Sequence, residues 1–203
     1  DTEEGPGRFI NHVYTLNGGK LTQSPLYRVT FDANGGEGTM NVKGYGGPEL
    51  PCTLPLNTFT PPKSYMSFRG WSTSPTGGVQ YVDGATLSGL DHDMVLYARF
   101  LLDFTFTLDG DGNATITGYT GARDKVDVPK VIEDHTVVAI GDGAFKDITF
   151  VTDITLPSTI VSIGDGAFKG LTNITKMELP SSVTRIGREA FSGCTSMAVL
   201  GLP

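Results

Sequence analysis

The sequence predicts a mainly β protein, within the α+β class, in which a small mixed sheet precedes a solenoid of stacked repeats. Three observations support this prediction. Glycine supplies 27 of the 203 residues and proline 12, which indicates many short strands joined by tight turns. Two sequence markers recur at one fixed step in the C-terminal part. Short runs of alternating β-branched and aromatic residues fill the first half.

The repeat is defined by two markers that keep the same step. Ile-Gly-x-x-Ala-Phe begins at positions 140, 163 and 186, so each copy lies 23 residues after the previous one. Leu-Pro begins at positions 156, 179 and 202 with the same offset of 23. This period lies within the roughly 20–29 residues of leucine-rich repeats. One such repeat cannot bury its apolar side alone, so the copies are expected to stack.

Alignment of the repeats places apolar residues in shared columns that must face the interior. These columns are Ile148, Leu171 and Cys194; Val151, Ile174 and Met197; Ile154, Met177 and Leu200; and Leu156, Leu179 and Leu202. We interpret Cys194 as a small buried apolar side chain; the alternative, a reactive thiol, requires exposure and a neighbouring cation. The Ala-Phe pair is expected to close a short helical turn at a corner that Gly141, Gly164 and Gly187 make tight.

Residues that alternate with the inward columns are expected to line an exposed sheet. They are Asp153 and Thr155, which flank Ile154, and Lys176 and Glu178, which flank Met177. Val199 and Gly201 follow in the third row. Solenoids commonly bind partners across such a concave face, so the first four are the candidate ligand-binding residues. The alternative is that they are solvated strand residues without a ligand.

A hairpin is expected to cap the solenoid at its N-terminal end. Residues 104–119 alternate aromatic and β-branched side chains around an Asp-Gly turn. Val128 and Ile140 are 12 residues apart, whereas the equivalent residues of the next repeat, Leu156 and Ile163, are 7 apart. The first repeat therefore carries a five-residue insertion. We expect residues 133–135 of that insertion to be solvated. The chain stops at Pro203 on a repeat marker without a polar cap, so we expect the natural protein to continue.

Chemical motifs are few. Asp109, Asp111 and Asn113 resemble the opening of a calcium loop, but Thr120 stands where a glutamate is required, and we favour turn chemistry. The three histidines stand far apart, without a partner at metal-ligand spacing. No nucleophile elbow, phosphate loop or dinucleotide motif occurs. We therefore expect no catalytic residue, no cofactor and no metal, and a protein that is not an enzyme.

The first half is expected to form a separate domain over residues 27–101. Strand patterns cover 27–36, which end in an Asn-Gly turn, and also 66–72 and 94–100. We interpret Trp71, the single tryptophan, as the core anchor of this domain rather than as a ligand platform. Residues 1–26 form either a hairpin packed on this domain or the tail of a preceding module. The second domain covers residues 102–203.

Charge and composition exclude several classes of protein. The formal charge is −7 and the isoelectric point is about 4.8, so a nucleic-acid partner and attraction to anionic lipid are not expected. No apolar stretch approaches the roughly 18 residues of a membrane span, and we expect no membrane insertion. Cys52, which we place in a proline-rich loop, and Cys194 make no disulfide framework. We expect a monomer.

Two resemblances follow from these motifs. The pattern Leu-Pro-Ser-x-Ile/Val-x-x-Ile-Gly-x-x-Ala-Phe over residues 103–203 resembles the BspA-type leucine-rich repeat, a bacterial surface family that implies export and adhesion. Val-Thr-Phe-Asp-Ala-Asn-Gly-Gly, Phe-Arg-Gly-Trp-Ser-Thr and Leu-Tyr-Ala-Arg-Phe over residues 27–100 resemble the internalin B-repeat, also called the Listeria–Bacteroides repeat. The second resemblance implies a β-grasp-like fold and a spacer or interaction module of surface proteins. The segment 52–62 departs from its pattern.

The resulting functional expectation is a non-catalytic adhesion module at the bacterial cell surface, outside the cell. Its partner is a protein or glycan on a host or bacterial surface, bound through the repeat sheet. The alternative is a structural spacer or stalk segment of a larger surface protein. An enzyme is the least favoured hypothesis, although a fold class by itself does not exclude a grafted site.

Overall fold

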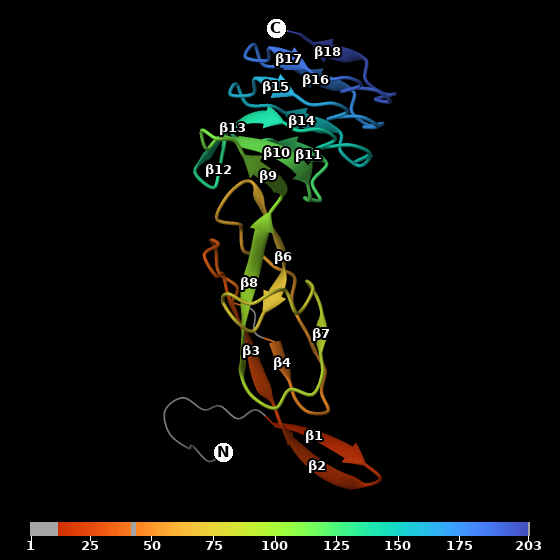
Figure 1. Cartoon of the computed structure of the whole chain (residues 1–203). Helices are drawn as coiled ribbons and strands as arrows, with labels where there is room; N and C mark the ends of the chain where they lie inside the picture. Colours follow the sequence, from red (N-terminus) through yellow and green to blue (C-terminus); the bar gives the residue numbers. More distant parts are fainter. Residues whose placement is uncertain (1–11, 42–43, 203) are drawn as a thin grey trace. The chain divides into compact units, whose positions relative to one another are not determined.

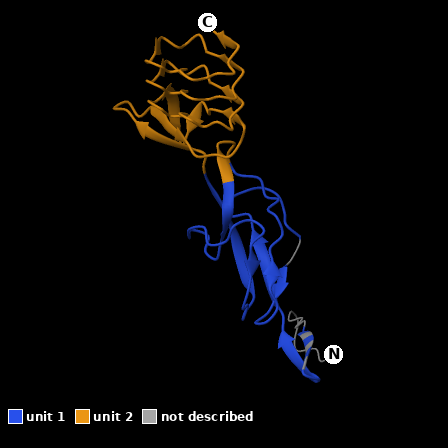
Figure 2. Ribbon diagram, turned by 90° about the vertical axis from the view of Figure 1, so that its right-hand side faces the viewer, with its two compact units in different colours: residues 1–62, 68–101 blue, residues 63–67, 102–203 orange. Residues whose placement is uncertain are grey.

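A computed structural model describes residues 12–41 and 44–202, which divide into two units. Unit 1 comprises residues up to Pro62 together with Phe68–Leu101, and unit 2 comprises Lys63–Ser67 together with Leu102–Pro203 (Figure 2). All regular structure in the described ranges is strand, so the mainly β prediction is confirmed and its helical component is not seen. The described part of the chain has no helix long and apolar enough to cross a membrane.

The strands of unit 1 form a hairpin and two sheets (Figure 1). They are β1 (His12–Asn17), β2 (Lys20–Pro25), β3 (Tyr27–Asp32), β4 (Gly44–Gly46), β5 (Cys52–Thr53), β6 (Met66–Ser72), β7 (Thr86–Leu87) and β8 (Met94–Leu102). β1 and β2 pair as a hairpin through a turn at Gly18 and Gly19, which both have positive φ. Its packing on the following domain stays a prediction. The rest of the N-terminal segment, residues 1–11, lies outside the described residues.

The main sheet of unit 1 has the order β4-β3-β8-β6, with β3 antiparallel to β4 and parallel to β8. Numbered by sequence among themselves, these strands have the order 2-1-4-3 of a β-grasp sheet. No helix covers the crossover from β4 to β6 in the described residues. The crossover instead contains β5, which pairs with β7.

The placement of Cys52 in a loop is wrong. Cys52 begins β5, is 2% exposed and pairs with Leu87. Prolines on both sides hid this two-residue strand in the sequence. A Cβ at Gly44 would lie 2.6 Å from the Cys52 sulfur, so the glycine lets β4 approach β5 closely.

Trp71 anchors the core of unit 1, as predicted. It is fully buried, and its ring centroid lies 4.8 Å from that of Phe31 and 4.9 Å from that of Phe68. Gly70, with φ of 139°, is required beside it, because a Cβ there would lie 2.4 Å from the Tyr81 carbonyl oxygen. The Trp71 amide donates to that same oxygen at 2.8 Å.

Unit 2 begins with the predicted cap and continues as a solenoid of about four turns. Its strands are β9 (Phe104–Leu108), β10 (Ala114–Tyr119), β11 (Lys125–Asp127), β12 (Val131–Ile132), β13 (His135–Ile140), β14 (Asp153–Thr155), β15 (Ser162–Ile163), β16 (Lys176–Glu178), β17 (Arg185–Ile186) and β18 (Val199–Gly201). β9 and β10 form the antiparallel hairpin of the cap, and β10 pairs parallel with β13 to start the stack.

The insertion in the first repeat forms regular structure; Glu133 and Asp134 are exposed as expected, whereas His135 is not fully solvated. β12 and the start of β13 form a small hairpin, with Glu133 and Asp134 at positive φ in its turn. His135 is half-buried, and its Nδ1 lies 2.8 Å from the Gly112 carbonyl oxygen in the cap. The insertion therefore fastens the cap hairpin to the first rung.

A short segment from the middle of the sequence completes unit 2. Lys63–Ser67 lie within the range 27–101 expected for the first domain, whereas these residues group with the solenoid. Tyr65 packs against the unit 2 core, and its carbonyl accepts a hydrogen bond from the Asp103 amide at 2.9 Å. The segment therefore covers part of the first rung.

A buried acid holds this segment in place. Asp103 is 1% exposed, accepts a 2.8 Å hydrogen bond from the Ser67 hydroxyl and lies 3.5 Å from the Arg123 guanidinium. Arg123 also donates to the carbonyl oxygens of Ser64 and Met66, at 2.7 and 2.8 Å. Because a buried carboxylate requires such partners, this network is structural.

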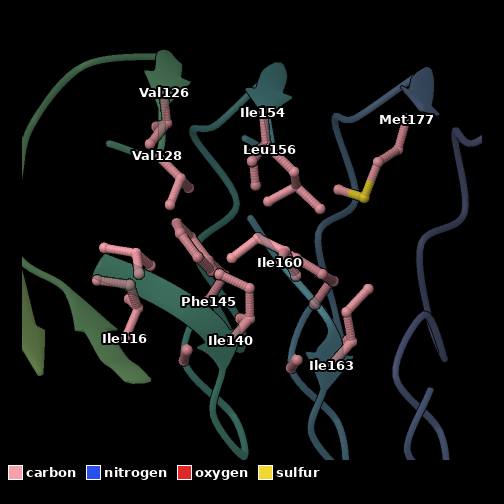
Figure 3. Packing of buried hydrophobic residues seen from close by; sticks show 14 of the residues in the cluster. Ile116, Val126, Val128, Ile140, Phe145, Ile154, Leu156, Ile160, Ile163 and Met177 are labelled. Carbon is pink, nitrogen blue, oxygen red and sulfur yellow. The ribbon is translucent and has the colours of Figure 1, made fainter. Parts of the chain in front are cut away.

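The repeat period sets the register of the stack. β13, β15 and β17 pair in parallel with Ile140 beside Ile163 and Ile163 beside Ile186. On the other side β16 and β18 pair with Met177 beside Leu200, and β11 pairs with β14. Figure 3 shows the interior, in which one row of side chains faces the other. Val126, Ile154 and Met177 point inward from one row, and Ile116, Ile140 and Ile163 from the opposite row.

An aromatic column runs through the stack. The rings of Tyr119, Phe145, Phe168 and Phe191 follow one another at centroid distances of 5.8, 5.4 and 5.4 Å, with interplanar angles of 24° or less. Phe145 and Phe168 are fully buried. The predicted equivalence of Phe145, Phe168 and Phe191 is confirmed, and Tyr119 extends their column into the cap.

The corner after each Ile-Gly is a series of hydrogen-bonded turns rather than the expected helical turn. Within a rung the Ala144 amide donates to Gly141, whereas the Phe145 amide donates to Ala167 of the next rung at 2.8 Å. Glycine is required in one column of the corner, Gly141, Gly164 and Gly187, because neighbouring rungs approach closely there. None of these three glycines has a positive φ. A Cβ at Gly164 would lie 2.6 Å from the Asp142 nitrogen.

The left-handed positions of the corner lie two residues later. Gly143, Gly166 and Glu189 have φ of 61°, 60° and 53°.

We expect Gly166→Ala to lower the free energy of unfolding by about 1–2 kcal/mol, because a Cβ is disfavoured at this φ although nothing crowds it within 3.7 Å. Urea unfolding followed by far-UV circular dichroism measures this. Gly110→Ala, at an uncrowded position without positive φ, is the control and should be neutral or stabilising.

The aromatic column provides a second prediction. Phe168→Ala should lower the free energy of unfolding by about 3–5 kcal/mol, because the ring is fully buried between two others. Phe150→Ala, at a side chain that is 49% exposed, should change it by less than about 0.5 kcal/mol. Equal effects of the two substitutions in urea unfolding would contradict the stacking.

Candidate functional site

The four predicted face residues lie on two adjacent strands of unit 2. Asp153 and Thr155 flank Ile154 in β14, and both are exposed while the isoleucine is buried. Lys176 and Glu178 flank Met177 in β16 in the same way. Strand alternation therefore points all four outward, from two strands that contact each other, as the sequence predicted. Their role in ligand binding remains a prediction.

These strands form the floor of a shallow groove of about 650 Å³. β11, β14 and β16 lie in succession along it (Figure 1). The groove is lined by Lys125, Thr152, Asp153, Ile154, Thr155, Leu156, Thr175, Lys176, Met177, Glu178, Leu179 and Pro180. The predicted set is thus contiguous in space, and the groove contains no aromatic side chain.

Lys125 belongs to the groove but was missed in the sequence. It lies beside Asp153 in the parallel pairing of β11 with β14. The pattern Lys-Val-Asp-Val-Pro over 125–129 matches Asp-Ile-Thr-Leu-Pro over 153–157, which was the available signal. The five-residue insertion makes this step 28 residues instead of 23, from Lys125 to Asp153, and so hid it.

The charges of the face follow two rows. One row reads Lys125, Asp153 and Lys176, and the other reads Asp127, Thr155 and Glu178. The Lys176 ammonium lies 2.6 Å from the Glu178 carboxylate. This contact raises the pKa of Lys176, with a further contribution from Asp153, and lowers the pKa of Glu178. Both charges are therefore maintained across the neutral pH range.

The charged rows end at β16. In the next strand of the stack, β18, Val199 is apolar and 51% exposed, and Gly201 presents no side chain. The face thus changes from charged to apolar along the solenoid.

The two thiols are unsuited to nucleophilic chemistry. Burial raises the pKa of Cys52 and, despite an opposing backbone hydrogen bond, that of Cys194. Cys194 is half-buried against the apolar core, and its sulfur lies 3.1 Å from the Phe168 carbonyl oxygen. These positions favour the interpretation of Cys194 as a packing residue.

The calcium-like loop is stabilised by its own side chains. The Asp109 carboxylate accepts hydrogen bonds from the Asn113 amide at 2.8 Å and the Asp111 amide at 3.0 Å. The Asn113 side chain donates a third bond, at 3.2 Å. These are the contacts of an Asx turn. Among the described residues no group of three or more His, Cys, Asp or Glu side chains is arranged to hold a metal ion.

Comparisons with known proteins identify both halves. Residues 124–203 match the family of the BspA type leucine rich repeat region (6 copies), and residues 27–99 match the Listeria-Bacteroides repeat domain. The two resemblances predicted from the motifs are confirmed in the stated order. No curated protein matches the chain.

Several solved structures are similar to about half of this chain. A leucine rich cell surface protein from Faecalibacterium prausnitzii A2-165 is 33% identical over 48% of this chain, with a TM-score of 0.45. A leucine-rich repeat protein from Bacteroides capillosus ATCC 29799 is 21% identical over 50% of this chain and 94% of its own, with a TM-score of 0.40. This chain spans 28% of the length of the Faecalibacterium protein.

The Asp109 turn yields a prediction for acid stability. Hydrogen bonds from Asn113, and then from Asp111 and Gly112, hold the pKa of Asp109 below its ordinary value. The stabilisation is therefore present above the unfolded pKa of about 4 and is lost as the pH falls through the lower folded pKa. Urea unfolding at neutral pH should show Asp109→Ala to be less stable than the unmodified chain, and this difference should shrink in acid.

Asp111→Ala is the matched control, since no hydrogen bond to its carboxylate is recorded. It should leave the acid dependence unchanged. Added calcium should leave the melting temperature of the unmodified chain unchanged. A calcium-dependent rise that Asp109→Ala removes would contradict the turn interpretation.

Proposed function

We propose that this chain is a non-catalytic interaction module of a bacterial cell-surface protein, and that the groove along β11, β14 and β16 binds its ligand. The match of residues 124–203 to the BspA type repeat region supports a surface protein. The observation that carries the binding proposal is the groove itself, because the charged side chains of Lys125, Asp153, Lys176 and Glu178 line it. Packing of the apolar core does not require charges at these outward positions.

A protein ligand is favoured over a glycan. A row of alternating charges such as Lys125, Asp153 and Lys176 recognises a partner by electrostatic complementarity, which provides specificity and speeds association. Asp153 and Lys125 form no ion pair with each other or with other described residues, and so they are available to such a partner. Host proteins and proteins of other bacteria are both suitable sources.

The absence of catalysis is part of the same proposal. The groove holds no histidine or cysteine, and the lysine of its single close ion pair has a raised pKa rather than one lowered toward neutrality. A role as a spacer is the alternative. It is favoured by the match of residues 27–99, which places a second repeat family in the same chain.

Binding to arrays of extracellular-matrix proteins and of host and bacterial glycans tests the proposal. Replacing Asp153, Thr155, Lys176 and Glu178 together with alanine should weaken binding to the protein that is recognised by at least about tenfold, which is about 1.4 kcal/mol. Lys146→Ala, at an exposed lysine of the corner turns, should leave the affinity unchanged.

Other outcomes decide between the alternatives. Unchanged affinity in the fourfold variant would refute the groove as the binding site. Binding to no member of either array would favour the spacer. Recognition of a glycan alone would replace the protein ligand in the proposal.

A further inference from the structure

The outer face of the main sheet in unit 1 has an unusual composition. Strand alternation buries Leu96 and Ala98 on the inner side of β8 and leaves Val95, Tyr97 and Arg99 on the outer side. Arg28 of β3 lies on the same outer side, directly opposite Tyr45 of β4. Arg69 of β6 also belongs to it, because its neighbour Phe68 packs inward on Trp71. All arginines of unit 1 in the described ranges thus lie on one sheet face.

Two of these arginines have no anionic partner. Among the described residues Arg28 and Arg99 form no ion pair, and the Nε atom of each is buried without a hydrogen-bond acceptor. The Arg99 guanidinium does donate to the Pro75 carbonyl oxygen at 2.6 Å. Within the described ranges the Arg28 guanidinium donates to no acceptor. A partly desolvated guanidinium of this kind gains from a carboxylate supplied by a partner.

The acidic groups near the face are few and already engaged. The Asp32 carboxylate, at the end of β3, accepts the Asn34 amide at 2.7 Å. The Asp93 carboxylate, before β8, accepts the Arg28 amide at 2.8 Å. The strand residues of the outer face include no lysine and no glutamate. The face therefore carries three arginines beside these two carboxylates, on a chain whose formal charge is −7.

Its composition matches that of a protein interface. Tyrosine and arginine are enriched in interfaces and supply most of their strongest contacts, whereas lysine and glutamate are depleted. Tyr45 is 42% exposed and Val95 is 43% exposed, so apolar area accompanies the guanidinium groups. We propose that the outer face formed by Arg28, Tyr45, Arg69, Val95, Tyr97 and Arg99 binds an acidic segment of another protein.

Calorimetric titration of the full chain with a copolymer of glutamate and tyrosine tests this proposal. The copolymer offers carboxylates to the arginines and rings to the apolar area. We expect it to bind and to bind about tenfold more weakly to Arg28→Ala, because the charge-assisted hydrogen bonds are lost. Arg28→Lys should lose less, since it keeps the charge but not the planar fork of donors.

Arg188→Ala is the matched control, because it removes the same charge from an exposed position in unit 2. It should bind the copolymer like the unmodified chain. Unchanged fluorescence of Trp71 verifies that each variant is folded. A failure to bind the copolymer, or an equal loss in Arg28→Ala and Arg188→Ala, would overturn the proposal. Binding of polyphosphate alone, lost in Arg28→Ala, would also overturn it and assign the face to a non-protein polyanion.

Discussion

Each rung of unit 2 depends on its neighbour to satisfy alternate amides of the corner turns. The Phe145 amide donates to the Ala167 carbonyl oxygen of the next rung, and the Phe168 amide donates to that of Ala190. The amides of the preceding residues, Ala144 and Ala167, bond within their own rung. Side chains repeat the arrangement, since the Asp142 carboxylate accepts the Asp165 amide and the Asp165 carboxylate accepts the Arg188 amide, each at 2.7 Å. A rung without its neighbour would lose these hydrogen bonds and expose the apolar side chains of Phe145 and Phe168.

This constraint fixes the position of every side chain on the surface as well. A parallel stack that must keep both its backbone bonds and its apolar columns in register cannot shift by one residue. The outward residues of β14 and β16 are therefore held in rows. Lys176 lies near both Glu178 of its own strand and Asp153 of the neighbouring strand, and both carboxylates raise its pKa. The same rigidity that serves the core arranges the charges of the groove.

The features that repeat are the ones that could be predicted from the sequence. The columns through Ile140 and Ile163 were predictable because two independent markers share one period. Lys125 was missed because the insertion disrupts that period, and the strand at Cys52 was missed because prolines mask it. The reason for the glycine column at Gly164 was also missed, because close approach between rungs cannot be inferred from a single rung. The arginine face could not be predicted, since its strands are far apart in the sequence.

The Lys63–Ser67 segment has a consequence for how such chains can be recombined. A genetic exchange that joined the repeats to another module at residue 102 would follow the apparent sequence boundary. It would leave behind the Ser67 hydroxyl that bonds to Asp103 and two of the carbonyl oxygens that bond to Arg123. The buried acid would then lose a hydrogen bond, and its arginine would lose two of its acceptors. Transferable repeats of this kind must therefore carry along part of the strand that precedes them in the other module.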